Sequence, residues 1–498
     1  MADFAAGLPL SLALRQARER LQGLESQFPT ATWLPVLFQN SAMLAPTWQS
    51  LQQHPEPPRP LWLRLLLPLG IGTAAAAVAI ALRLLGLLQP AELALFDHWL
   101  RSRPAELPDG RIVVVEASAA DLDRELPGDL QSGQSLSDKT QEQLLEKLLA
   151  YEPAFIGWDI YRNFKTERPR LEQRLAETDN LITICKFADP DPKATAFKGY
   201  VQAPEIPESD LPTRVGFSDG PEDPDRKHRI QLLYSDPDST CPARYSLSSI
   251  LGFSYLQKTE GIELAETSAQ DGYTWRWGNV AIAPIGGTGT GKFNQFQPYG
   301  PYARADVRGH QIWLNYRSSH PSGDSKRKAS PIETFKRFTV ADVLEGKPAK
   351  TEIENKIVLV GITGTGLTFT GADMATTPFR DQNGAALAIP GVYIQAQMTS
   401  QIISAALDGR KLLRALPWAL DLLLVWIAVL PLLAFLYSRS PKWFSIAIAI
   451  EILLLYGIAW ATFTALGLYL PWIPASLALI LGGVASERLN FAKERPAK

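Results

Sequence analysis

The sequence predicts a large α/β domain with a mixed, partly parallel sheet, held at a membrane by four transmembrane helices. One observation is the run Leu65–Leu82, which reads LLLPLGIGTAAAAVAIAL and carries no charge. A second is the return of long apolar stretches after residue 415. The third is the middle of the chain, where β-branched runs alternate with amphipathic helical patterns, as they do in βαβ units.

The composition limits the classes of protein that fit. The chain has 498 residues, which is room for two or three domains, and a formal net charge of −2. Because there is no excess of basic residues, nucleic acid is not an expected partner. The two cysteines, Cys185 and Cys241, are too few for a disulfide scaffold. They could form one bridge in an oxidising compartment; the alternative is two separate buried thiols.

Residues 1–60 are expected to form a short cytoplasmic leader. Apolar residues near helical spacing predict one helix between Leu10 and Leu21. The run Thr32–Phe38 is strand-like but contains Pro35, and a proline-rich stretch follows at Pro55–Pro60. One helix and one strand cannot bury a core of their own. The opening residues lack the basic and apolar regions of a secretory signal, so membrane entry is assigned to the next segment.

The first transmembrane helix is predicted at residues 61–88. A spanning helix needs about 20 mostly apolar residues. Arg64 and Arg83 close the uncharged run at its two ends. Arginines near helix ends can extend to the membrane surface, so they are compatible with a span.

Residues 89–410 are predicted to form the α/β domain. A helix is expected at Leu93–Arg103, and a buried strand at Arg111–Glu116. An amphipathic helix at Asp138–Ala150 and a second strand at Ala154–Asp159 follow. Strand, helix and strand at this spacing predict two parallel strands joined by a right-handed crossover.

The rest of this segment continues the alternation of strands and helices. Strands are predicted at Leu181–Cys185, Arg214–Phe217, His228–Tyr234, Asn279–Ala283, Gln311–Tyr316 and Lys356–Gly361, and helices at Arg168–Thr178, Ala243–Leu256, Val340–Leu344 and Pro390–Leu407.

Three further transmembrane helices are predicted at residues 415–437, 443–464 and 468–486, followed by a tail at 487–498. Asp421 and Glu451 lie within these apolar segments, and acids inside a membrane are functional candidates by default. The favoured interpretation is structural: Asp421 lies at the membrane interface, and Glu451 bonds to a neighbouring helix.

The distribution of basic residues predicts the orientation. They flank the leader, the loop between the second and third spans, and the tail: Arg59, Arg64, Arg439, Lys442, Arg488, Lys493, Arg495 and Lys498. The positive-inside rule then places these parts in the cytoplasm and the 89–410 domain outside an inner (plasma) membrane that the chain crosses several times. Arg410, Lys411 and Arg414 oppose this orientation. They are discounted because long translocated domains respond weakly to charge.

Two glycine-rich loops resemble phosphate-binding motifs. Gly286–Phe293 reads GGTGTGKF, but Phe293 cannot supply the hydroxyl that holds Mg²⁺, and no helix is predicted after it. An NTP-dependent enzyme is therefore not favoured. Gly361–Gly366 follows a good strand but lacks the dinucleotide spacing, so a tight turn is expected there.

A polar pocket is predicted at the carboxyl ends of the strands, where open α/β sheets bind ligands. Glu116, Ser118, Asp159 and Asp373 lie at or soon after such ends and are the candidate ligand-binding residues. The alternative is that these short polar groups only cap helices and bond within turns. The five histidines are scattered, so no metal, cofactor or catalytic residue is expected.

The order of these parts resembles the second CHASE class of bacterial sensory domains. The matching stretches are FDHWLRSR, RIVVVEAS, EPAFIGWDIYRNF, RVGFSDGPEDPDRKHR, QIWLNYRSS, FTVADVLEGK, NKIVLVGITGTGLTFTGADMATTPF and PGVYIQAQMTSQIISAALDG, which run from Phe96 to Gly409. Two departures from the family pattern stand out. The acidic-serine step after the first strand has Glu116 in place of aspartate, and ELPGDLQSGQSLSD stands where a Trp-Pro-Trp-x-Arg element is usual.

The resemblance implies a membrane-anchored extracytoplasmic sensor. Such a protein would detect an unknown ligand or envelope signal and transmit it across the membrane, without catalytic activity of its own. The family couples to cytoplasmic kinases, cyclases or CHAT modules, and residues 8–40 are similar to the tail of a CHAT caspase-like domain. The expected partners are therefore the membrane, the ligand, a separate cytoplasmic signalling protein and a second copy of the chain.

The alternative is a scaffolding membrane protein that binds an envelope partner. A concave polar pocket would favour the sensor, whereas an exposed apolar patch would favour the scaffold.

Overall fold

The computed structural model describes residues 2–33, 46–52, 61–126, 129–130, 134–188, 199–266, 274–285, 296–320, 328–364, 373–430 and 441–494. The chain divides into two compact units, Met1–Pro68 and Leu69–Lys498. The first contains α1 (Ala2–Ala5), α2 (Leu10–Gln22), the 3-10 helix η1 (Ala31–Trp33) and α3 (Trp48–Gln52). The predicted leader helix is confirmed as α2. Thr32 and Trp33, the first residues of the strand-like run, lie in η1, and the rest of that run lies outside the described residues.

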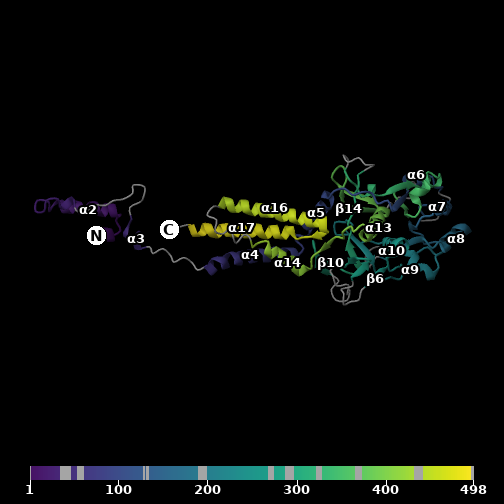
Figure 1. Ribbon diagram of the computed structural model, residues 1–498, viewed down its shortest axis with the longest axis horizontal. Coiled ribbons are helices and arrows are strands. Elements are labelled where there is room, and N and C mark those ends of the chain that lie inside the picture. The colour runs from purple at the N-terminus through teal and green to yellow at the C-terminus, as the bar shows by residue number, and fades with distance from the viewer. Residues whose placement is uncertain are drawn as a thin grey trace. The chain divides into compact units, whose positions relative to one another are not determined.

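The second unit combines an α/β domain with a group of apolar helices, which lie at its opposite ends in Figure 1. The apolar helices are α4 (Leu61–Leu84, which begins in the first unit), α14 (Trp418–Ile427), α16 (Pro441–Leu466) and α17 (Trp472–Glu494). Between the two parts runs α5 (Gln89–Ser102), which follows α4 directly.

The α/β domain is built on a six-stranded sheet in the order β12-β1-β13-β2-β3-β4. Every pair of neighbouring strands in it is parallel. The strands are β1 (Ile112–Ala117), β2 (Phe155–Asp159), β3 (Leu181–Cys185), β4 (Val215–Phe217), β12 (Lys336–Thr339) and β13 (Ile357–Ile362).

Helices cover both faces of this sheet, because alternate strand residues point to opposite sides. Leu359 of β13 belongs to the core under α10 (Leu247–Glu260) and α13 (Gly391–Leu407). Its neighbours Val358 and Val360 belong to the core on the other face, with α7 (Asp138–Ala150), α8 (Pro169–Glu177) and α11 (Val340–Leu344). The domain is therefore a three-layer α/β/α sandwich.

The predicted βαβ unit is present, but its two strands are not neighbours. β1 and β2 are parallel, as predicted, and β13 lies between them. All residues of β13 from Ile357 to Gly361 are buried, which fits a strand that is flanked on both edges and covered on both faces. The sequence gave no sign that β13 lies between β1 and β2, because β13 begins some 200 residues after β2 ends.

The antiparallel strands form small separate sheets instead of extending the main one. These are the pairs β5 (Ile230–Tyr234) with β11 (His310–Trp313), β9 (Phe296–Tyr299) with β10 (Tyr302–Asp306) and β14 (Met374–Arg380) with β15 (Ala386–Pro390), and the trio β6 (Leu264–Glu266), β7 (Trp275–Trp277) and β8 (Val280–Ile282). The prediction of one mixed sheet is thus corrected to a parallel sheet with antiparallel satellites.

The structure supports fewer membrane spans than the sequence predicts. Among the described residues, one helix is long and apolar enough to cross a membrane, Ser445–Leu466 within α16. The segment Leu69–Leu84 and α5 pass the same test only as a pair, and an 85° bend separates them. Trp418–Ile427 and Trp472–Ser486 are shorter apolar helices. Four transmembrane helices therefore remain a prediction.

The apolar helices contact one another through small side chains. Ala76 and Ala79 of α4 pack with Val425 of α14 and Ala478 of α17 in one buried cluster. Small residues at such contacts allow backbones to approach closely, as is common between helices in membranes.

The two cysteines are joined by a disulfide. Cys185 ends β3, and Cys241 follows β5; their Cα atoms are 5.3 Å apart. Of the two alternatives that the sequence leaves open, the bridge is the one found.

Candidate functional site

The carboxyl edge of the parallel sheet gathers polar side chains from several strands. Asp159 is the last residue of β2, and Glu116 lies one residue before the end of β1. The N-terminus of α13 is at the same edge, where the Gly391 amide donates a hydrogen bond to the Asp373 carbonyl oxygen at 2.8 Å. With Ser118, which directly follows β1, all four predicted site residues thus lie at or next to this edge.

Glu116 and Ser118 have local partners. The Tyr393 hydroxyl, from α13, donates a hydrogen bond to the Glu116 carboxylate at 2.5 Å. Ser118 is the N-cap of α6 (Ala119–Leu122): its hydroxyl accepts from the Asp121 amide, and its own amide donates to the Asp121 carboxylate. Ser118 therefore has the capping role that the sequence analysis gave as the alternative.

Asp159 lies in an electrostatically strained position. Burial, and then the charge of Asp373, raise the pKa of Asp159 to about 7, while Lys186 acts in the opposite direction. Close by, Tyr161 shares a 2.7 Å hydrogen bond with Ser218, at the carboxyl end of β4. The charges of Asp159 and Asp373 thus act on each other. That they share a ligand pocket stays a prediction, because none of the four predicted residues lines the cavity described below.

We expect the stability of the protein to depend on pH through Asp159. Its folded pKa of about 7 lies above the ordinary 3.8. Between about pH 4 and pH 7 the folded chain therefore holds a proton that the unfolded chain has released, and the free energy of unfolding falls as pH rises. Above that window the cost is constant, at about 4 kcal/mol. Asp159→Asn should remove this cost and raise the melting temperature at pH 8 more than at pH 4.

The measurement is thermal unfolding of the full chain in detergent from pH 4 to pH 8. The exposed Asp179, at the opposite end of the sheet, provides the control variant Asp179→Asn. Parallel pH profiles for the wild type and Asp159→Asn would contradict the assignment.

A cavity of about 840 Å³ opens beyond this edge. It is lined by Gln89, Lys186, Phe187, Ala188, Asp219, Gly220, Pro221, Glu222, Asp223, Pro224, Ile230, Leu232, Ser235, Asp236, Asp238, Tyr302, Arg304, Ala305, Asp306, Arg308 and Gln311. Six of these side chains are acidic and three are basic. Its size is that of a small-molecule site.

A buried ion network connects the cavity wall to α5. The Arg229 side chain is 1% exposed, and its Nε and Nη2 atoms donate to the two carboxylate oxygens of Asp97, in α5, at 2.7 and 2.9 Å. Arg229 also bonds to Asp223, which lines the cavity, at 2.5 Å, and to Asp225 at 2.7 Å. Hydrogen bonding to Arg229 and its charge outweigh burial and lower the pKa of Asp225 to about 2.

Aromatic side chains attach the other side of α5 to the apolar helices. Phe96 packs against Phe463 of α16 with ring centroids 5.4 Å apart. Trp99 is fully buried and lies 5.6 Å from the ring of Tyr469, which follows α16. A single turn of α5 is therefore in contact with both the α/β domain and the membrane-length helix.

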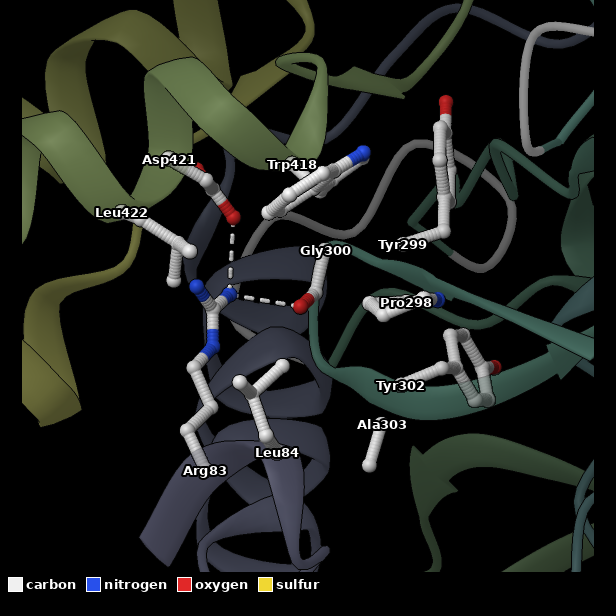
Figure 2. Close-up of a pocket in the computed structure, with 10 residues that line it drawn as sticks. All are labelled: Arg83, Leu84, Pro298, Tyr299, Gly300, Tyr302, Ala303, Trp418, Asp421 and Leu422. Atoms are coloured by element: carbon white, nitrogen blue, oxygen red, sulfur yellow. Dashed lines mark hydrogen bonds and ion pairs between the residues drawn. The ribbon is translucent and has the colours of Figure 1, made fainter. Parts of the chain in front are cut away.

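A second buried charge cluster surrounds Arg83 at the end of α4 (Figure 2). Its guanidinium bonds to Asp421 of α14 at 2.9 Å and to Glu92 of α5 at 3.2 Å. The same Nη2 atom donates to the carbonyl oxygen of Gly300, in the β9–β10 turn, at 2.6 Å. Gly300 has a φ of 53°, and a Cβ there would meet the Trp313 ring, so only glycine fits.

The Arg83 cluster corrects one sequence interpretation and specifies another. Arg83 does not extend to the surface: it is 7% exposed and paired. Asp421 was expected to lie at the membrane interface, whereas in the structure it is buried and forms an ion pair with Arg83. Glu451 is half-buried in α16, and no described residue forms an ion pair or hydrogen bond with it.

Neither Asp97 nor Arg229 was singled out by the sequence analysis. Asp97 was visible as one acid between Phe96 and Trp99 in an otherwise apolar helix face. Arg229 ends the charged stretch PEDPDRKHR, which was noted only for its family resemblance. The pairing of the two segments, about 130 residues apart in sequence, was not visible.

Other sequence candidates receive no support as chemical sites. Among the described residues, no group of three His, Cys, Asp or Glu side chains could hold a metal ion. The loop Gly286–Phe293 lies outside the described residues, as does the end of Gly361–Gly366.

The fold is a three-layer α/β domain with a cavity at the carboxyl edge of its sheet, joined through one helix to a group of apolar helices. The family model of the CHASE2 domain matches residues 74–435. The chain therefore belongs to the CHASE2 family of extracellular sensory domains. No curated protein and no solved structure matches it.

Proposed function

We propose that the chain is a multi-pass inner-membrane sensor without catalytic activity of its own. Its α/β domain would bind an envelope ligand in the 840 Å³ cavity and the adjoining edge with Asp159 and Asp373. Ligand binding would shift the domain between two states, to the extent that its affinity for them differs. The membrane helices would carry this shift to a separate cytoplasmic signalling protein, in a single chain or a homo-oligomer.

The proposal rests on α5, because this helix contacts both the α/β domain and the apolar helices. Asp97 bonds it to Arg229, and through Arg229 to the cavity wall at Asp223. Two residues later, Trp99 packs onto Tyr469 beside α16. A change at the cavity that moves Arg229 must therefore break a buried network or move α5 against the membrane helices.

Two further observations support a membrane location with the domain outside. Large apolar side chains are exposed on the apolar helices, among them Leu420, Leu423, Ile446, Ile450, Leu453, Leu454, Ile458 and Ile480, as expected where lipid covers them. The Cys185–Cys241 disulfide is typical of oxidising compartments.

The orientation can be tested by thiol labelling of intact cells. Both native cysteines are paired, so they need not be removed. A single cysteine is introduced at the exposed Ser209, in the α/β domain, or at the exposed Ser26, in the leader. We expect an impermeant maleimide to label Ser209→Cys on intact cells, and Ser26→Cys only after permeabilisation.

The unmodified chain is the internal control. It should label only after reduction and unfolding, because its thiols are bridged. The reverse labelling pattern, or labelling of the native chain without a reductant, would place the domain in the cytoplasm and remove the sensory proposal.

A further inference from the structure

A basic pocket of about 260 Å³ lies where α16 meets the α/β domain. Figure 1 shows that end of α16 beside α5, at the boundary between the apolar helices and the domain. The pocket is lined by Arg103, Pro104, Ala105, Glu106, Asn315, Arg410, Lys411, Leu413, Phe463, Thr464 and Gly467. It is separate from the acidic cavity, with which it shares no lining residue.

The pocket carries an excess of positive charge. Three basic side chains, Arg103, Arg410 and Lys411, face one acid, Glu106. Arg410 donates hydrogen bonds to both carboxylate oxygens of Glu106, at 2.7 and 2.6 Å. Within the described part of the chain, Arg103 and Lys411 have no carboxylate partner. Burial and the charge of Arg410 lower the pKa of Arg103 to about 10, because together they outweigh the opposing charge of Glu106.

Two hydrogen-bond donors in the pocket are also unused. The two Nη atoms of Arg103 donate hydrogen bonds to the Asn315 side-chain oxygen at 2.6 Å and to the Tyr316 carbonyl oxygen at 2.9 Å. Its Nε is buried without a partner among the described residues, and so is the Thr464 hydroxyl. Buried donors are normally satisfied, so an orphan in a charged pocket indicates a missing acceptor. Oxygens of an anion would serve both donors.

The position of the pocket indicates which anion. Thr464 lies in the last turn of Ser445–Leu466, the membrane-length helix. If that helix crosses the bilayer, as the proposed function requires, its last turn lies at the depth of the lipid headgroups. Guanidinium and ammonium groups between membrane helices are suited to phosphate.

We propose that this pocket binds the phosphate group of an anionic phospholipid in the outer leaflet. Arg103 Nε and the Thr464 hydroxyl donate to the phosphate oxygens, and Lys411 supplies a point charge at the exposed rim. This site gives a reason for Arg410 and Lys411, two of the basic residues that oppose the positive-inside rule. Because these two charges form part of a binding site, they do not indicate on which side of the membrane the domain lies.

Native mass spectrometry of the full chain in nonionic detergent tests the proposal. The protein is incubated with phosphatidylglycerol or with phosphatidylcholine of the same acyl chains. We expect retention of phosphatidylglycerol over phosphatidylcholine. Lys411→Gln should weaken retention about fivefold, the effect of one surface charge on anionic lipid. Thr464→Val should weaken it while leaving the charge unchanged.

The matched control is Arg414→Gln, which removes the same charge three residues away from a side chain that does not line the pocket. Equal losses in Lys411→Gln and Arg414→Gln, or equal retention of the two lipids, would overturn the proposal. Displacement of the lipid by inorganic phosphate at equal concentration would assign the pocket to free phosphate and would also overturn it. Lipid retention is measured without signal or orientation, so a negative result leaves the sensor proposal intact.

Discussion

Arg229→Ala is expected to lower the free energy of unfolding of the α/β domain by about 3–5 kcal/mol, the usual cost of removing one partner of a buried ion pair. Arg229 is 1% exposed and bonds to Asp97, Asp223 and Asp225. Without it, the cation that bonds to these carboxylates among the described residues is Lys227, which reaches Asp97 at 2.7 Å and Asp225 at 3.2 Å, while Arg101 acts on Asp97 through its charge. At least one negative charge then stays buried without compensation.

The loss should be largest in α5, because Asp97 is the link between this helix and Arg229. Hydrogen exchange of the full chain should show faster exchange in the α5 amides than in the central strands. Arg229→Lys should be intermediate, since an ammonium group cannot form the fork of bonds that holds Asp97.

Arg226→Gln is the matched control for Arg229→Ala. It removes a cation from the same loop, but Arg226 is exposed, so we expect a change within about 0.5 kcal/mol. Equal effects of the two variants, or a stable Arg229→Ala with unchanged exchange in α5, would show that the network does not hold this helix.

The sequence predicted the elements of the domain better than their assembly. The run Ile357–Gly361 was recognisable as a strand because it is uniformly apolar. Its place between β1 and β2 was not, since periodicity carries no information about which strands pair. Parallel pairing across long sequence distances depends on tertiary packing, and here on the fit of α13 against β13, where a Cβ on Gly361 would meet Val392.

The candidate site divides in the same way. Asp373 directly precedes β14, outside the main sheet, so its place beside this edge did not follow from the position of a strand end. The place of Asp159 at the edge could be predicted, because a topological rule applies to the carboxyl ends of strands in any open α/β sheet. Asp97, Arg229 and Arg83 could not, because their importance lies in partners that only the fold brings together. A buried arginine and a surface arginine have the same sequence pattern, and burial of a charge is favourable only where the partners are already in place.

Arg83→Leu is expected to have the second large effect, on the attachment of the apolar helices. Glu92 and Asp421 are 0% and 2% exposed, and Arg83 is the cation bonded to both. Its removal leaves two buried carboxylates and frees the Gly300 carbonyl oxygen (Figure 2). We expect a loss of about 3–5 kcal/mol, measured as a lower melting temperature and a smaller monodisperse fraction of the full chain in mild detergent.

Neutralising Glu92 and Asp421 shows whether Arg83→Leu destabilises the protein through loss of the positive charge or through loss of side-chain packing. In the triple variant Arg83→Leu, Glu92→Gln and Asp421→Asn, no buried charge of the cluster remains, so part of the stability should return. Asp421→Asn alone should be mild, because it leaves one cation for one carboxylate, and the Oδ1 atom of Asp421 already has no partner among the described residues. If the triple variant were as unstable as Arg83→Leu, packing of the Arg83 stem would be the cause. If Arg83→Leu matched the wild type, the cluster would not hold α4 and α14 to the domain, and Asp97 would be left as the connection through which α5 responds to the cavity.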